Sequence, residues 1–198
     1  MTFSDGTQIE CVPSVRLVGV ILSQNLRWNE NTKYICEKAR RKLWILRRMQ
    51  GLDLNEWQLF DVYTKEIRSI LEMAVPVWHS SLTKLQSNEI EKVQKIAMKI
   101  ILKHKYVSYD LACRKFNTIT LEERREKLCY KFASKNLKSD HSYFTKPVKD
   151  VNTKNKSSMA VKEIKCNYDR YRKSSIPCKF TKHIQQVEPE KYFKEYFP

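Results

Sequence analysis

The spacing of apolar residues changes once along the chain, close to Trp28. Before that position, residues 8–12 alternate polar and apolar side chains and residues 15–22 form an apolar run, so each segment is predicted to be a β-strand. An Asp5-Gly6 dipeptide precedes both strands and favours a tight hairpin turn. After Trp28 the apolar residues recur every three or four positions, which is typical of α-helices.

The first predicted helix extends from residue 29 to Gly51. Its apolar residues lie on one stripe, which is expected to face the core. The glycine at its end is expected to adopt the left-handed conformation that commonly terminates helices. The stripe consists of Ile35, Ala39, Leu43, Leu46 and Met49.

Four further helices are predicted. The second begins at Asn55 and is expected to end or kink near Pro76, because proline disrupts the hydrogen-bond pattern of a helix. The third lies within residues 83–103, and a short fourth helix follows Ser108. The fifth begins at Thr120, which is expected to form a capping box with the glutamate three residues later. The inner faces of the second and third helices are predicted to carry Trp57, Phe60, Tyr63, Ile67, Ile70, Leu71, Ala74 and Trp78, and Leu85, Ile90, Val93, Ala97, Ile100 and Ile101, respectively.

The predicted fold class is mainly α, with an N-terminal β-hairpin, a bundle of about five helices and a poorly ordered basic C-terminal tail. Residues 138–165 are rich in Lys, Ser, Asn and Asp and show little periodicity, which favours a flexible connection. The predicted divisions are a hairpin over residues 1–28, a helical bundle over 29–103, further helices over 104–137 and the tail over 138–198.

The chain carries a large excess of positive charge. Its 198 residues include 38 Lys and Arg against 22 Asp and Glu, which gives a formal net charge of +16. Residues 1–28 have no net charge, so the whole excess follows Trp28. Such an excess favours binding to a polyanion, with nucleic acid as the first expectation and an anionic membrane surface as the second. The alternative is a solvated basic surface.

The first predicted helix is the most basic part of this region. Arg40, Trp44, Arg47 and Arg48 share a face away from the apolar stripe, as expected where a phosphate backbone is bound and a base or sugar packs on an aromatic ring. The alternative is a solvated face, and Trp44 taken alone is expected to be buried against a neighbouring helix. The residues predicted to bind nucleic acid are Lys33, Lys38, Arg40, Arg41, Lys42, Trp44, Arg47 and Arg48.

A second basic group lies at the start of the fifth predicted helix, where the helix dipole disfavours cations. It consists of Arg124, Arg125 and Lys127, and these residues are expected to have a partner or a functional reason for their position. His79, at the end of the second predicted helix, is expected to be a cation that interacts favourably with the helix C-terminus.

The sequence lacks the motifs of common catalytic and metal sites. It contains no Asp-Asp pair and no GxxxxGK[ST], HExxH or GxSxG motif. Cys166, Cys178 and His183 come closest to a zinc site, but they lack a closely spaced pair and a fourth ligand. No cofactor and no metal are therefore expected.

The six cysteines form no CxxC pair and no regular framework, which favours reduced thiols and an intracellular location, nuclear or cytoplasmic. The N-terminus lacks the basic and apolar regions of a signal peptide. No apolar stretch approaches the roughly 20 residues that span a bilayer, so no membrane partner is expected.

The segment VRLVGVILSQNLRW, residues 15–28, resembles the end of the palm domain in reverse transcriptases of jockey-like non-LTR retrotransposons. In that family an aromatic-Leu-Gly-Val core precedes an Asn- or Asp-containing turn, a Leu and a Trp. Val18 stands where the family usually has the Leu. The resemblance covers nearly all of residues 3–180. It continues in KYICEKARRKLWILRRM, DVYTKEIRSILEMAVPVWHSSLTKLQSNEIEKVQKIAMKIIL and YVSYDLACRKFNTITLEERREKLCYKFASKNLK, and weakly in KCNYDRYRKSSIP.

This resemblance implies a C-terminal fragment of a polymerase that copies RNA into DNA. Residues 3–22 would correspond to the primer-grip hairpin, residues 29 to 102 to the thumb that holds the template–primer duplex, and residues 104–184 to a C-terminal extension. The palm aspartates that hold two metal ions in the family would lie upstream, so the chain alone is expected not to be an enzyme. The primer-grip-like residues are Leu17, Val18, Gly19 and Val20.

The expected function is therefore binding of RNA or an RNA–DNA duplex, alone or with the rest of a reverse transcriptase supplied in trans. One alternative is a helical protein–protein interaction module in which Trp57, Trp78 and the C-terminal aromatic residues are anchors. Another is a decayed element copy with no selected function.

The hairpin itself carries two expectations. Gly19 is expected at a turn or at a close approach of the backbone, with a bend or bulge as the alternative. The apolar face of Val15, Leu17 and Ile21 is expected to be covered by the helices or to self-associate.

Overall fold

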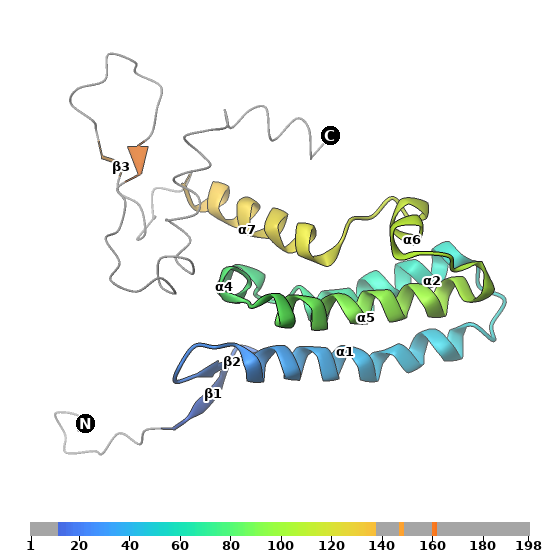
Figure 1. Ribbon diagram of the computed structural model, residues 1–198, viewed down its shortest axis with the longest axis horizontal. Helices are drawn as coiled ribbons and strands as arrows, with labels where there is room; N and C mark the ends of the chain where they lie inside the picture. The colour runs from blue at the N-terminus through green and yellow to red at the C-terminus, as the bar shows by residue number, and fades with distance from the viewer. Residues whose placement is uncertain (1–11, 138–146, 149–159, 162–198) are drawn as a thin grey trace, which may run out of the picture. The chain divides into compact units, whose positions relative to one another are not determined.

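The computed structural model describes residues 12–137 together with the strands β3 (Pro147–Val148) and β4 (Ala160–Val161). The described chain is mainly helical and begins with a β-hairpin, which confirms the predicted fold class (Figure 1). It divides into two compact units. Within the described residues, the first comprises 12–74 and 82–122, and the second comprises 75–81 and the residues from 123 onward.

The hairpin consists of β1 (Ser14–Leu17) and β2 (Val20–Ser23), which pair antiparallel. The prediction of one strand over residues 15–22 is therefore wrong. Val18 and Gly19 both have positive φ angles, 46° and 83°, and form the two-residue turn that reverses the chain. Positive φ at both central positions suits the twist of a tight hairpin. The strand predicted over residues 8–12 lies outside the described residues except for its last residue, which is not in a strand.

Gly19 is both a turn residue and a point of close approach. A Cβ atom at this position would lie 2.7 Å from Cε of Met73, closer than such contacts normally come. Both halves of the expectation for Gly19 are therefore confirmed.

Only the second strand of the hairpin is well covered. Val20 is buried, and the backbone N–H of Ile21 donates a 3.1 Å hydrogen bond to Oδ1 of Asn31 in the following helix. In the first strand, Val15 and Leu17 are 52% and 58% exposed. The helices thus cover part of the hairpin's apolar surface and leave the rest open.

The core of the first unit lies between two long helices, α1 (Asn29–Met49) and α5 (Lys84–Leu102). They run in the same direction, and residues 56–71 of the same unit return antiparallel to them (Figure 1). The predicted stripe of α1 is buried except for its last residue, Met49, which is half-buried. Helix α1 ends at Met49, with Gln50 as its C-cap, and Gly51 after it is not left-handed, so the predicted capping conformation of Gly51 is wrong.

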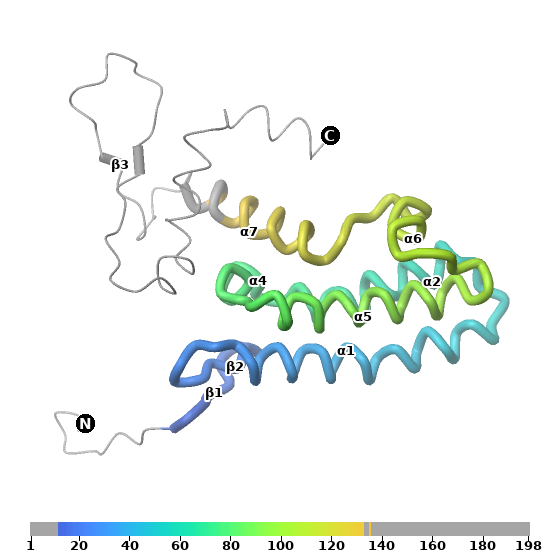
Figure 2. Tube along the Cα trace, viewed as in Figure 1, coloured from blue at the N-terminus to red at the C-terminus, as the bar shows by residue number. Residues whose placement is uncertain are grey.

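The second predicted helix is interrupted rather than continuous (Figure 2). Asn55 caps its first turn and forms a capping box with Gln58, which confirms the predicted start. The helix ends before Pro76, at a turn in which Ala74 has a φ of 52°, and Pro76 lies in the first turn of the next helix, where proline is tolerated. The segments are α2 (Glu56–Val62), the π-helix η1 (Tyr63–Arg68), α3 (Ser69–Leu71), α4 (Val75–Trp78) and the 3-10 helix η2 (His79–Ser81).

Helix α5 buries most of its predicted apolar residues, but Leu85 is 78% exposed, contrary to the prediction. Its neighbour Gln86 is buried instead, and both polar atoms of the Gln86 side chain have hydrogen-bond partners. Gln86 forms a capping box with Thr83, and its Nε2 donates to the carbonyl of Arg27 and to Oδ1 of Asn29 at 2.8 and 2.6 Å. These bonds tie the start of α5 to the start of α1.

Two further helices follow α5 and the 3-10 turn η3 (Lys103–Lys105): α6 (Tyr109–Lys115), capped by Ser108, and α7 (Leu121–Leu137). Glu91 of α5 holds the start of α7, because its carboxylate accepts the backbone N–H groups of Leu121 and Glu122 at 3.0 and 3.2 Å. The Tyr109 hydroxyl also donates to this carboxylate. Burial and this bond raise the pKa of Tyr109, so the hydroxyl remains a donor.

Gln94 extends this polar network into the core. Its Oε1 accepts the Tyr63 hydroxyl at 2.6 Å, and its Nε2 donates to the Tyr109 hydroxyl and to the carbonyl of Ile119. Every polar atom of the Gln94 side chain therefore has a partner, which lowers the free-energy cost of burying it.

The second unit contains α4, η2, α7 from Glu123 and the paired strands β3 and β4. Arg125 is fully buried, and its Nε donates a 3.3 Å hydrogen bond to Nδ1 of His79. His79 thus receives a hydrogen bond from the arginine that was predicted to need a partner. The remainder of the predicted tail lies outside the described residues.

No helix in the part of the chain that the structure describes has the length and apolar character needed to cross a membrane.

Replacing Gly19 with alanine is expected to lower the free energy of unfolding by about 1–2 kcal/mol, because a residue with a Cβ is strained at positive φ. Gly51→Ala is the matched control. It lies outside the left-handed region, and its Cβ would make only an ordinary 3.5 Å contact. The control is expected to be neutral or slightly stabilising. Urea unfolding followed by circular dichroism measures both, and equal losses would contradict the assigned turn.

Replacing Glu91 with glutamine is expected to destabilise the chain by about 1–3 kcal/mol, because a charged acceptor of three hydrogen bonds is lost. Hydrogen exchange at the amides of Leu121 and Glu122 should become faster in this variant. Glu122→Gln makes the same charge change on an exposed side chain at the start of the same helix, and it should leave exchange nearly unchanged. If Glu122→Gln accelerated exchange as much, Glu91 would not be the group that holds α7.

Candidate nucleic-acid interface

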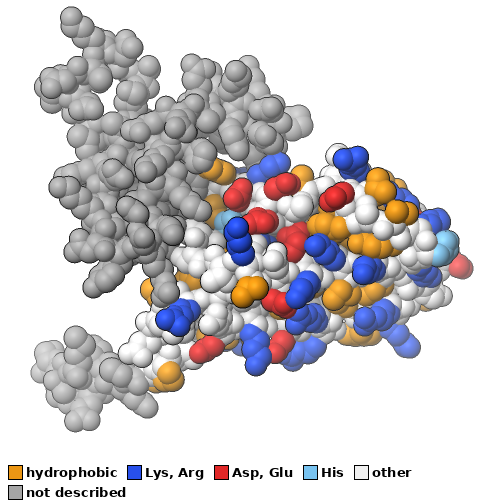
Figure 3. Space-filling view, viewed as in Figure 1, with side chains coloured by type: hydrophobic (Ala, Val, Ile, Leu, Met, Phe, Trp, Pro, Cys, Tyr) orange, Lys and Arg blue, Asp and Glu red, His pale blue; other side chains and the backbone are white. Residues whose placement is uncertain are grey.

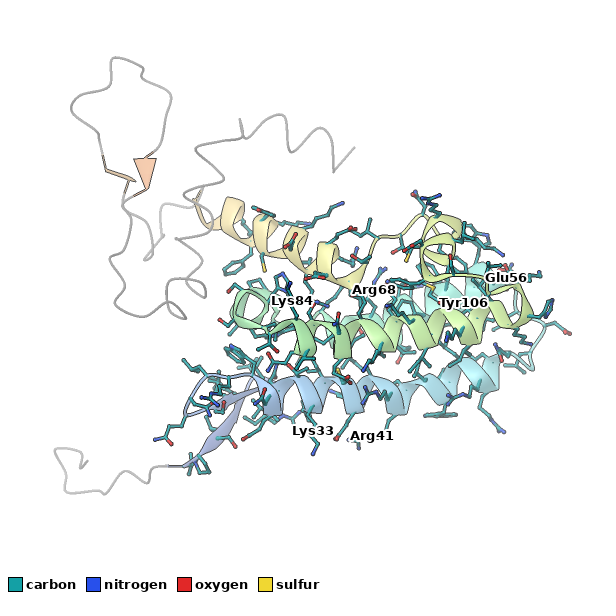
Figure 4. All side chains as sticks on the ribbon, in the orientation of Figure 1. Lys33, Arg41, Glu56, Arg68, Lys84 and Tyr106 are labelled. Carbon is teal, nitrogen blue, oxygen red and sulfur yellow. The ribbon has the colours of Figure 1, made fainter. Side chains whose placement is uncertain are left out.

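The outer face of α1 carries most of the predicted binding residues. Because a helix repeats every 3.6 residues, the buried stripe leaves the opposite side of α1 to the solvent. Lys33 and Arg41 lie on the side of α1 that faces away from α5 (Figure 4). Lys38 and Lys42 are half-buried at the edges of this face. The exposed residues are Lys33, Arg40, Arg41, Trp44, Arg47 and Arg48, and we call this set the α1 basic face.

Trp44 is 58% exposed, so the expectation that it is buried against a neighbouring helix is wrong. Its outward position follows from the register of α1, because the core-facing positions beside it are Leu43 and Leu46.

Two of the cations on α1 are engaged by acidic residues of neighbouring elements. Arg40 Nη2 lies 2.9 Å from Glu89 Oε2 of α5, and Lys42 Nζ lies 3.1 Å from Glu66 Oε2 of η1. Within the described residues, the remaining exposed cations form no ion pair. These are Lys33, Arg41, Arg47 and Arg48.

Glu89 is shared between the two long helices, since it pairs with both Lys92 of α5 and Arg40 of α1. The hydrogen bonds from Lys92 and Arg40 hold the pKa of Glu89 below its usual range. The carboxylate therefore stays charged, and continues to partly neutralise this edge of α1, well below neutral pH.

A second basic ridge on α5 was not predicted. Lys92, Lys95 and Lys99 are exposed, and the last two lie over the rings of Tyr109 and Tyr106, at 5.1 and 5.5 Å from the ring centroids. Their spacing of three and four residues was readable in the sequence. Figure 3 shows Lys and Arg predominating where the C-terminal halves of α1 and α5 lie.

The hairpin residues predicted to act as a primer grip lie at the N-terminal end of α1, whereas the arginines lie in its C-terminal half (Figure 1). Leu17 and Val18 are exposed, and Val20 is buried. The second predicted basic group is not a free surface, because Arg125 is buried.

One of the two helical tryptophans expected to anchor a protein partner is not accessible in the structure. Trp78 is fully buried, and only Trp57 of the two helical anchors is exposed. Trp57 in turn packs edge-on against Phe116, with ring centroids 5.3 Å apart.

Within the described residues, no group of three or more His, Cys, Asp or Glu side chains could hold a metal ion. Two of the cysteines there, Cys36 and Cys113, are buried. The three residues considered for zinc lie outside the described residues.

Glu89→Gln should strengthen binding to an RNA–DNA duplex by about three- to tenfold at low salt, because it removes a negative charge and releases Arg40 and Lys92. Glu56→Gln is the matched control. It makes the same charge change and releases Lys105 and Lys115, which lie on η3 and α6. Fluorescence anisotropy measures both affinities. An equal gain from the two variants would show that net charge matters and the α1 basic face does not.

Comparisons with protein-family models, with curated proteins and with solved structures find no match to this chain.

Proposed function

We propose that this chain binds nucleic acid through the α1 basic face, with arginine and lysine side chains contacting phosphate groups. The observation that carries the proposal is the absence of any ion pair, within the described residues, at Lys33, Arg41, Arg47 and Arg48 on a single exposed face. Unpaired cations on one face of a helix attract a polyanion, and each phosphate contact releases counterions.

The local sequence strengthens this reasoning. Residues 38–49 contain six Lys and Arg and no Asp or Glu. Cations in the last turn of α1 also stabilise the helix through its dipole, which would explain Arg47 and Arg48 alone. Arg40 lies earlier in the helix and pairs with Glu89. Arg41 also lies where the dipole has little effect and forms no ion pair within the described residues, so it needs another reason.

The proposed ligand is a template–primer duplex of RNA and DNA, and the proposed origin is the thumb of a non-LTR reverse transcriptase. The support is the resemblance of residues 15–28 and the helical segments after them, in an order compatible with a hairpin followed by helices. In this proposal catalysis belongs to a palm with its own aspartates, and the chain alone does not polymerise DNA.

A salt titration tests the binding proposal. The affinity of the full chain for an RNA–DNA duplex should fall steeply as salt rises. In the variant Arg41→Gln/Arg47→Gln/Arg48→Gln, the slope of log affinity against log salt should be shallower by about one for each phosphate contact removed.

The control variant is Lys65→Gln/Lys103→Gln/Arg114→Gln, which removes the same charge from exposed residues of η1, η3 and α6. It should keep the wild-type slope. Equal flattening in the two variants would assign binding to net charge, and no binding at low salt would refute the proposal altogether.

A further inference from the structure

Trp44 differs from the other tryptophans in the described residues. Trp28 and Trp78 are buried, and Trp57 is 55% exposed but packs against Phe116. Trp44 is 58% exposed and makes no ring contact within the described residues. More than half of the Trp44 surface is therefore accessible to a ligand.

Arginines occupy every neighbouring position on the helix surface around Trp44. Arg40 and Arg41 precede it by four and three residues, and Arg47 and Arg48 follow it by three and four. Side chains at these spacings have Cβ atoms about 5–6 Å apart on one helix face. The cation–π contacts of the described residues use Tyr34, Tyr106 and Tyr109, so none of these arginines covers the indole.

We infer that Trp44 stacks on an unpaired base of a single-stranded segment while the surrounding arginines contact its flanking phosphates. This inference rests on the proposed function and adds an unpaired strand next to the duplex as a further ligand of the same face. An aromatic ring within a basic surface is the arrangement by which proteins bind unpaired nucleotides, because every base has a π face and every linkage has a charge.

A fully paired duplex would not use this side chain in the same way. Inside a duplex both faces of each base are covered by neighbouring bases, and the phosphates alone are presented to a helix surface. A ring projecting from the centre of four arginines gains a stacking partner only where a base is unstacked. The charge of the surrounding residues favours a polyanion over an apolar protein surface as the occupant.

The test compares two single strands of about 12 nucleotides, one of thymidines and one of abasic residues with the same phosphates. The full chain should bind the thymidine strand about tenfold more tightly. Trp44→Leu, which keeps an apolar helix-forming residue, should bind both strands with the affinity of the wild type for the abasic strand. Trp44→Phe, which keeps an aromatic face, should retain part of the difference.

The outcomes separate this inference from the proposed function. Equal wild-type affinities for the two strands would overturn base stacking and leave phosphate binding intact. A preference for thymidine that persists in Trp44→Leu would place the stacking at another residue and also overturn it. No binding to either strand at low salt would also overturn this inference, whereas the salt titration with the RNA–DNA duplex tests the proposed function separately.

Discussion

The structure of the first unit depends on the burial of one stripe of α1 against its neighbours. Ile35, Ala39, Leu43 and Leu46 are almost completely buried, and each large side chain contributes about 1.5–3 kcal/mol relative to exposure. The helical repeat then fixes what happens on the opposite side. Arg41, Trp44 and Arg48 cannot reach the core in the same register, so burial of the stripe presents them to the solvent.

Helix α5 joins the remaining elements through buried polar groups. Gln86 connects it to the start of α1, Gln94 connects it to Tyr63, and Glu91 connects it to the start of α7. Such groups are costly when unpaired and are inexpensive when every donor and acceptor has a partner. The helix that supports the α1 basic face is therefore held by specific hydrogen bonds as well as by apolar packing.

The sequence was sufficient for the helical repeat, the core stripe of α1 and several helix starts, because these depend on local spacing and capping residues. It was insufficient where long-range contacts decided the outcome. Gly19 was expected at a turn and the second helix was expected to end or kink near Pro76. The sequence did not show that Val18 and Ala74 take part in these turns, because side chains with a Cβ rarely favour positive φ. Gln86, Gln94 and Arg125 are buried although their residue types are usually exposed.

The same distinction applies to the candidate site. The cations of α1 could be assigned to one face from their spacing, whereas the pairing of Arg40 with Glu89 and the exposure of Trp44 depend on how α1 and α5 pack. The α1 basic face is the proposed contact surface for nucleic acid. The indole N–H signals of the four tryptophans in an NMR titration test it most directly, with Trp44→Phe identifying one of them. Addition of nucleic acid should shift the signal of Trp44 and leave that of the exposed Trp57 unchanged, whereas a shift of Trp57 without Trp44 would contradict the claim.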